Sequence, residues 1–304
     1  MIYQDPLAYL LGIEGLALLE AWHGEHDRAF TEARLAEIRQ LLDDDKLRDR
    51  GVLAERADNV TAYGRWAATY DPDAAGGLFD TEEPVIAECL GDRAPGVALD
   101  AACGTGRYAE ILAKRGHKVI GVDSSPDMLA HAQRRVPDGE FHVGELDHLP
   151  LPDDSVDVIV CTLALAHIPR LEPVFAEFAR VLRPGGDLII SDLHHEWGAL
   201  SNGGITVRGP AGEPARGPEY LHKLGDYLRP ALSLGLQVRR CEELGGRQPD
   251  ESQPEEPLPE REPTAEVGDW QAWPWSLMGY LPLAARVCSA RPTLVIWHFQ
   301  QPTA

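Results

Sequence analysis

Two aspartates frame a turn of small residues near the middle of the chain. Asp100 ends one apolar run, the turn at residues 102–106 follows it, and Asp123 ends the next apolar run, about 20 residues beyond the turn. Small residues in such a turn let backbone amides approach a ligand closely and open the following helix N-terminus toward it. An acidic Asp100 suits a cofactor with an ammonium group better than a pyrophosphate, and Asp123 is placed to bind both hydroxyls of a ribose.

The same residues also have a purely structural interpretation. Gly104 and Gly106 fit an ordinary turn between a strand and a helix, and Asp100 and Asp123 fit helix caps. We interpret Cys103 as a small residue of the turn and not as a nucleophile, because nothing nearby in the sequence suggests a paired base. A strict GxGxxG pattern, which would favour a dinucleotide, does not occur at this turn.

Alternating strands and helices must position these side chains. From residue 63 to residue 244 short apolar runs alternate with helix-length segments, which predicts βαβ units around a mostly parallel sheet. The expected strands are 97–99, 118–122, 140–143, 156–161, 188–191 and 236–239, and the expected helices are 107–115, 125–136, 171–182 and 220–234. The run TLVIWHFQ at residues 293–300 predicts one more strand.

The two ends of the chain differ from this pattern. Residues 1–62 predict a helical extension that packs on its own chain or on a second copy. An insert at residues 245–292 begins with an acidic, proline-rich stretch, 248–266, which we expect to be mobile, and continues with tryptophans. We therefore expect two units, an extension (1–62) and a main domain (63–304).

Composition limits the classes of binding partner and the cellular compartments that are expected. The 304 residues include 28 Lys and Arg against 49 Asp and Glu, a formal net charge of −21, so nucleic acids and anionic membranes are poor partners. No run approaches the roughly 20 uncharged apolar residues that span a bilayer, and the N-terminus lacks the basic start of a secretory signal. Five scattered cysteines without a CxxC pair favour a reduced, cytoplasmic chain without structural zinc. A homodimer is left open.

Four segments together resemble a known family. DAACGTG, VDSSPDML, LPLPDDSVDVIV and RVLRPGG occur in the order and at the spacing of the class I S-adenosylmethionine-dependent methyltransferases. The resemblance covers residues 63–192 well and gives almost no information about the substrate. It implies an α/β, Rossmann-like sheet of seven mostly parallel strands with a reversed last strand, and transfer of a methyl group from S-adenosyl-L-methionine, leaving S-adenosyl-L-homocysteine.

The expected acceptor is an O, N or C nucleophile of a small molecule, with specialised metabolism as one setting. Two alternatives stay open at this point. One is a non-catalytic, cofactor-binding regulatory protein with the same fold. The other is a nicotinamide oxidoreductase, which Asp100 and the missing GxGxxG disfavour.

The resemblance assigns cofactor contacts residue by residue. The methionine part would face Asp100, Ala102, Cys103, Gly104 and Gly106; the ribose would face Asp123; the adenine would face Ser124 or Met128 and, at its rim, Glu145 and Leu146; and Cys161 would lie beside the methyl donor. Two positions depart from the family's pattern. Ala102 replaces a glycine, and Glu145 replaces the more usual aspartate at the expected contact with the adenine amine.

Histidines and aromatic residues are the candidates for catalysis and for substrate binding. His167, His194 and His195 follow two strands at the carboxyl edge of the sheet, where a base would act; each also fits a structural role, and we expect no metal at these histidines. In the resembling family the tract before the first strand covers the cofactor pocket, so Tyr63, Trp66 and Tyr70 are lid candidates or, alternatively, core residues. Trp273 either walls an apolar pocket or packs on the sheet edge.

Overall fold

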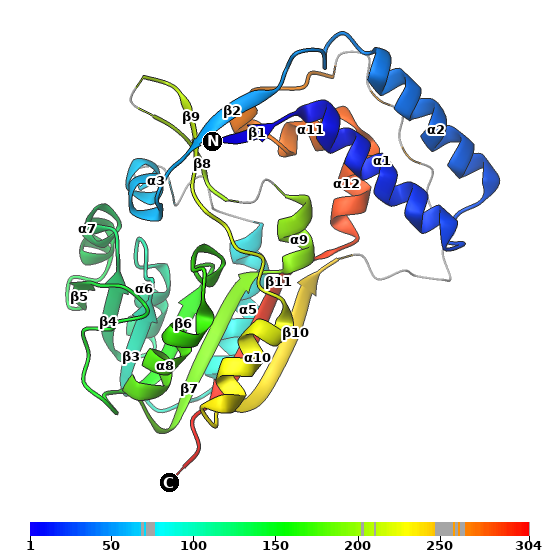
Figure 1. The fold of residues 1–304 in the computed structure, drawn as a ribbon. Helices are drawn as coiled ribbons and strands as arrows, with labels where there is room; N and C mark the ends of the chain where they lie inside the picture. Colours follow the sequence, from blue (N-terminus) through cyan, green and yellow to red (C-terminus); the bar gives the residue numbers. More distant parts are fainter. Residues whose placement is uncertain are drawn as a thin grey trace.

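The computed structural model describes residues 1–67, 70, 77–201, 204–209, 211–246, 258, 261 and 265–303. A twisted sheet of seven strands forms its centre, in the order β10-β11-β7-β6-β3-β4-β5 (Figure 1). These strands are β3 (Val97–Ala101), β4 (Lys118–Asp123), β5 (Glu140–Val143), β6 (Val156–Thr162), β7 (Leu182–Leu193), β10 (Gln237–Gly245) and β11 (Pro292–Gln300). Only β11 runs against the others, between β7 and β10. The predicted seven-stranded, mostly parallel sheet with a reversed last strand is confirmed.

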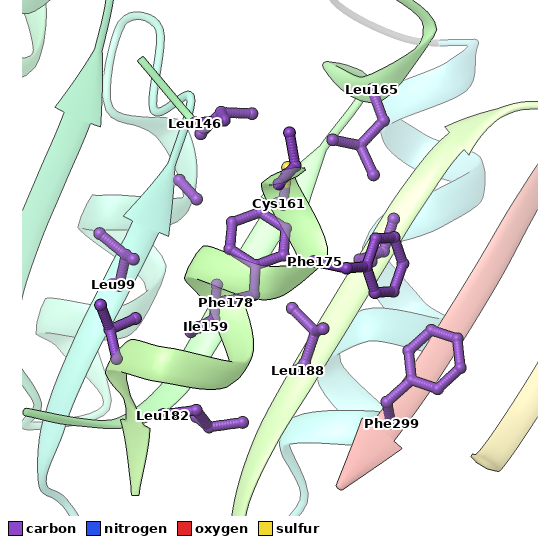
Figure 2. Close-up of a cluster of buried hydrophobic side chains, with 14 of the residues drawn as sticks. Leu99, Leu146, Ile159, Cys161, Leu165, Phe175, Phe178, Leu182, Leu188 and Phe299 are labelled. Carbon is purple, nitrogen blue, oxygen red and sulfur yellow. The ribbon is translucent and has the colours of Figure 1, made fainter. Parts of the chain in front are cut away.

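Helices cover both faces of this sheet. On one face lie α8 (Leu171–Val181) and α10 (Leu224–Ser233), whose side chains Phe175, Phe178 and Tyr227 are buried against strand residues such as Leu188 and Phe299 (Figure 2). On the other face lie α5 (Leu78–Leu90), α6 (Arg107–Lys114) and α7 (Pro126–Arg135). Both faces of the central strands β3, β4 and β6 are buried, as expected for parallel strands built from Val, Ile and Leu.

The N-terminal extension and the C-terminal insert share a second hydrophobic core. The helices α1 (Pro6–Trp22), α2 (Arg28–Asp43), α11 (Trp275–Tyr280) and α12 (Pro282–Ser289) and the short η2 (Trp270–Ala272) surround it. We call residues 1–47, 258, 261 and 265–291 the accessory lobe; Figure 1 shows it beyond the carboxyl ends of the parallel strands. Because the two segments pack together, they form one unit in space, and the division of the chain at residue 62 stays a prediction.

Ion pairs also join the two segments of the lobe. Arg261 pairs with Glu37 and Asp44, and Arg291 pairs with Glu20. Most of the stretch 248–266, which we expected to be mobile, lies outside the described residues. Its described members include Arg261, which is held by these pairs, and Leu258, which packs on the core of the lobe.

A small sheet connects the lobe to the main domain. Its order is β1 (Ile2–Gln4), β2 (Val52–Arg56), β9 (Pro214–Arg216) and β8 (Thr206–Arg208). The helix α3 (Asn59–Trp66) follows β2 directly and packs on β8 through Ala62. This arrangement holds α3 over the carboxyl ends of the parallel strands (Figure 1). In the described ranges no helix is both long enough and apolar enough to cross a membrane.

Candidate active site

A cavity of about 290 Å³ opens at the carboxyl ends of β3, β4, β5 and β6, the edge at which open α/β sheets bind ligands. Its walls come from α3 and from the loops that follow these four strands. The lining consists of Asp58, Asn59, Val60, Tyr63, Tyr70, Ala102, Gly104, Asp123, Ser124, Ser125, Met128, Gly144, Glu145, Leu146, Thr162, Leu163, Ala164, His167 and Ile168.

The turn after β3 has the backbone conformation that its small residues permit. Gly104 has φ +51°, and a Cβ atom added to it would meet no other atom within 4 Å, so a side chain here would project into open space. Gly106 has φ +83°, and an added Cβ would lie 2.9 Å from the Ala132 Cα, so this glycine permits the close approach of α7. Of the two predicted glycines, Gly104 lines the cavity and Gly106 instead serves helix packing.

Ala102 occupies a conformation that favours glycine. Its φ is +55°, in the left-handed region that costs an L-residue roughly 1–2 kcal/mol. Cys103 lies next to it but points into a small apolar cluster, and burial raises the pKa of its thiol far above the usual value. Cys103 is therefore placed as a packed, protonated thiol outside the cavity lining.

Asp123, which lines the cavity, holds two turns together. Its Oδ2 accepts a hydrogen bond from the Gly104 amide at 2.8 Å, and its Oδ1 accepts one from the Ser125 amide, also at 2.8 Å. Burial raises the pKa of this carboxyl against the lowering effect of both hydrogen bonds. Each carboxylate oxygen keeps further acceptor capacity, which is what two ribose hydroxyls require.

Asp100 faces away from the cavity lining. Its Oδ2 accepts a hydrogen bond from the Ala109 amide at 2.7 Å, in the first turn of α6, and the side chain is buried. Burial raises the pKa of Asp100 to about 7. The alternative interpretation of this residue as a helix cap therefore matches its position.

Tyr63 and His167 meet across the cavity. The distance between the Tyr63 hydroxyl and His167 Nε2 is 2.7 Å, and His167 Nδ1 lies 2.9 Å from the Pro218 carbonyl oxygen. A carbonyl only accepts, so Nδ1 carries the proton, Nε2 is the acceptor, and Tyr63 donates to it. Burial lowers the pKa of His167 and raises the pKa of Tyr63 far above its usual value. We call this pair the Tyr63–His167 dyad.

Aromatic rings extend from the dyad along one wall. The ring centroids of Tyr63 and Tyr70 lie 6.1 Å apart, and those of Trp66 and Tyr70 lie 4.9 Å apart. Tyr63 and Tyr70 line the cavity, whereas Trp66 packs behind them. Both interpretations of this tract therefore hold in part, because two rings face the cavity and one supports them.

Besides Trp66, Asp100, Cys103 and Gly106, four more predicted site residues lie outside the cavity lining. His194, which is buried, donates from Nε2 to Glu243 at 2.7 Å, and His195 begins α9 (His195–Leu200) with its ring against that of His194. Trp273 is buried in the accessory lobe, where its indole N–H donates to the Val267 carbonyl. Cys161 lies in the main core between Leu146 and Leu165 (Figure 2), fully buried. Each of these side chains is committed to packing or to another partner, so their positions do not support the expected roles at the site.

The remaining predicted cofactor residues meet at the cavity. Ser124, Met128, Glu145 and Leu146 all line it together with Asp123. The structure adds residues that the sequence did not single out, among them Asn59, whose Nδ2 donates to the His167 carbonyl at 3.0 Å. The only sequence signal for Asn59 is the cap residue Asp58 at the start of a helix, which gives no position relative to the sheet.

Comparisons with known proteins agree with this geometry. Residues 99–190 match a family model described as a methyltransferase domain. The chain is 32% identical over 170 residues to a malonyl-[acyl-carrier protein] O-methyltransferase of Yersinia pestis, covering 56% of this chain and 59% of the relative. It is 30% identical over 223 residues to the uncharacterized methyltransferase AN0656 of Emericella nidulans, covering 60% of this chain and 77% of the relative.

Solved structures share the fold. An S-adenosylmethionine-dependent methyltransferase from Mesorhizobium loti superposes with a TM-score of 0.51 at 20% identity, over 72% of this chain and 97% of that one. At this identity the likeness concerns the fold alone, and the substrate has to be argued from the cavity.

Proposed function

The chain belongs to the class I S-adenosylmethionine-dependent methyltransferases, and from this premise we propose that it transfers a methyl group to a small molecule bound beside the Tyr63–His167 dyad. One observation carries the proposal: a single cavity is lined both by cofactor-motif residues, such as Gly104 and Asp123, and by a hydrogen-bonded tyrosine and histidine.

The residues present fit the family's cofactor. Gly104 and Asp123 both line the cavity, and a side chain added to Gly104 would project into open space. We propose that Asp123 binds the ribose hydroxyls and that Met128, Glu145 and Leu146 bind the adenine. When bound, S-adenosylmethionine would supply a methyl carbon bonded to a sulfonium sulfur; an acceptor attacking that carbon from the opposite side would release the sulfur as a neutral thioether.

The dyad supplies the base. A neutral His167 Nε2 can take the proton of Tyr63, while the Tyr63 oxygen takes the proton of the acceptor. The acceptor's freed electron pair then forms the new bond to carbon, and the histidine carries the extra positive charge. Alignment within the cavity and exclusion of water supply the rest of the rate enhancement.

Methyl transfer tests the proposal directly. The protein should bind S-adenosylhomocysteine by calorimetry, should not bind NAD, and should transfer labelled methyl groups from S-adenosylmethionine to members of a panel of phenols, amines and acids. Cofactor binding without transfer to any acceptor would instead support the alternative of a non-catalytic regulatory protein.

Location and assembly are proposals as well. The five cysteines are all free thiols, which supports a reducing, cytoplasmic setting. The net charge of −21 supports small-molecule partners over nucleic acids, and specialised metabolism stays one setting for them. A homodimer stays a prediction that sedimentation of the full chain can test.

A further inference from the structure

The charge of the cavity wall limits what can bind beside the dyad. The described lining carries three carboxylates, Asp58, Asp123 and Glu145, and no Lys or Arg side chain. Proteins bind carboxylates and phosphates with Arg or Lys side chains, which the described lining does not offer.

Two further carboxylates, which are not part of the described cavity lining, lie within electrostatic range of Tyr63. Asp192, at the end of β7, is buried and accepts a hydrogen bond from the Tyr227 hydroxyl at 2.7 Å. Glu219 precedes α10 and lies within electrostatic range of Arg216. Besides burial and Tyr70, the negative charges of Asp123, Asp192 and Glu219 raise the pKa of Tyr63. Tyr63 therefore keeps its proton unless the neutral His167, whose Nε2 accepts the Tyr63 hydrogen bond, receives it.

From this arrangement we infer that the acceptor is an uncharged hydroxyl compound of the phenol or enol type. The inference rests on the proposed function and names its substrate class. Such a hydroxyl enters without a charge and loses its proton in the step itself. The O–H proton passes to the Tyr63 oxygen, the Tyr63 proton passes to His167 Nε2, the oxygen electron pair forms the bond to the methyl carbon, and the C–S bonding pair returns to sulfur.

Other acceptor classes fit the wall less well. An acceptor carboxylate meets no cation in the described lining and meets the like charge of Asp58, since Asp123 and Glu145 are assigned to the cofactor. A substrate carried by an acidic protein meets a chain of net charge −21. An alkylammonium is attracted, but the carboxylates stabilise its protonated form, which has no electron pair to donate. A phenol has a pKa near 10, low enough for a paired histidine to assist, and its ring can pack on Tyr63 and Tyr70.

A matched set of three acceptors tests the inference. A phenol, a benzoate and a benzylamine with the same ring substituents should be compared as methyl acceptors, and their binding to the S-adenosylhomocysteine complex should be measured by calorimetry. We expect kcat/KM for the phenol to exceed both others by at least about tenfold, with tighter phenol binding than benzoate binding. Preferred methylation or tighter binding of the benzoate, or preferred methylation of the benzylamine, would overturn it.

A charge introduced at the rim provides a second test. Val60 lines the cavity from α3 and is 40% exposed, so a longer side chain can reach water there. Val60→Lys should raise the benzoate-to-phenol ratio of kcat/KM about tenfold, whereas the uncharged control Val60→Gln should leave this ratio near that of the original protein. An equal response of both variants would contradict the charge argument.

The two proposals fail in different ways. Loss of S-adenosylhomocysteine binding in the original protein would refute the proposed function before any acceptor is compared. Normal cofactor binding with benzoate as the favoured ligand would leave the methyltransferase proposal intact and refute the acceptor class alone.

Discussion

The Tyr63 hydroxyl donates a hydrogen bond to His167 Nε2 over 2.7 Å, although the two residues lie 104 positions apart. The Pro218 carbonyl fixes the tautomer from the other side of the imidazole ring. Three segments therefore meet at one proton: α3, the short η1 (Leu165–His167) after β6, and the loop before α10. This relationship gives His167 a defined acceptor nitrogen, which an isolated histidine at a strand end would not have.

Removing either member of the dyad should slow turnover without affecting the cofactor. Tyr63→Phe and His167→Gln should each lower kcat by about 10²–10⁴-fold, and the double variant should be little slower than either single one, because the two act as a unit. S-adenosylhomocysteine affinity should stay within about twofold. His194→Gln and His195→Gln are matched controls outside the cavity and should keep kcat.

The pH dependence of turnover follows from the burial of His167. Burial lowers the pKa of His167, so the neutral base persists to lower pH than for an exposed histidine. The ascending limb of the kcat profile should therefore lie below pH 6.5 and disappear in His167→Gln. Full turnover in both dyad variants would show that the pair is structural and that the acceptor enters already deprotonated.

Asp123 should matter for cofactor affinity. Asp123→Ala removes the proposed ribose acceptor and also frees the Gly104 and Ser125 amides, so we expect a loss of roughly 1.5–3 kcal/mol in S-adenosylhomocysteine binding. Asp138→Asn, at an exposed acid in the turn after α7, controls for the change in net charge. Unchanged calorimetric affinity in Asp123→Ala would contradict the assignment of Asp123 to the ribose hydroxyls.

Ala102 should be a site where glycine stabilises. Its φ of +55° strains an alanine, so Ala102→Gly should raise the free energy of unfolding by about 0.5–1 kcal/mol once the greater freedom of glycine in the unfolded chain is counted. Ala113→Gly, in the regular helix α6, should instead lower it by about 1 kcal/mol. Urea unfolding of the two variants should move the midpoint in opposite directions.

The strands and the cofactor turn could be predicted because their signals are local. β3, β4 and β6 are continuous apolar runs, and the turn after β3 is recognised by its small residues within a few positions. The same locality placed Asp123 correctly, since it ends β4 beside Gly104. Asp100 was placed on the correct strand, but the sequence did not reveal that its carboxylate turns toward the first turn of α6.

The helix α5 and the position of Trp273 could not be predicted, because they depend on the direction of side chains and on contacts between residues far apart in the sequence. The helix α5 was missed because its Pro84 and acidic residues are untypical of a packed helix, yet Glu82 is fully buried by an ion pair with Arg107 and a hydrogen bond from Ser191. Trp273 was expected either on a pocket wall or against the sheet edge, and it packs instead in the accessory lobe, whose core forms only when the two ends of the chain meet. Contacts of this range leave no periodic signal in either segment.

A partly buried histidine on β11, His298, should make stability depend on pH. His298 Nε2 donates to Asp187 Oδ1 at 3.0 Å, and the same carboxylate pairs with Arg93. Burial alone would lower the pKa of His298, but the hydrogen bond and charge of Asp187 outweigh it and raise the pKa to about 9.

A base with a raised pKa in the folded state binds its proton more tightly there than in the unfolded chain. The resulting stability, roughly 2–3 kcal/mol, is fully present below the unfolded pKa of about 6.5 and is lost as the pH rises through about 9. Urea unfolding between pH 6.5 and 9.5 should therefore show falling stability. His298→Gln keeps a donor for Asp187 but cannot titrate, so its stability should fall less steeply across this range. Parallel pH curves for the two proteins would show that His298 stays neutral in the fold and that Arg93 alone neutralises Asp187.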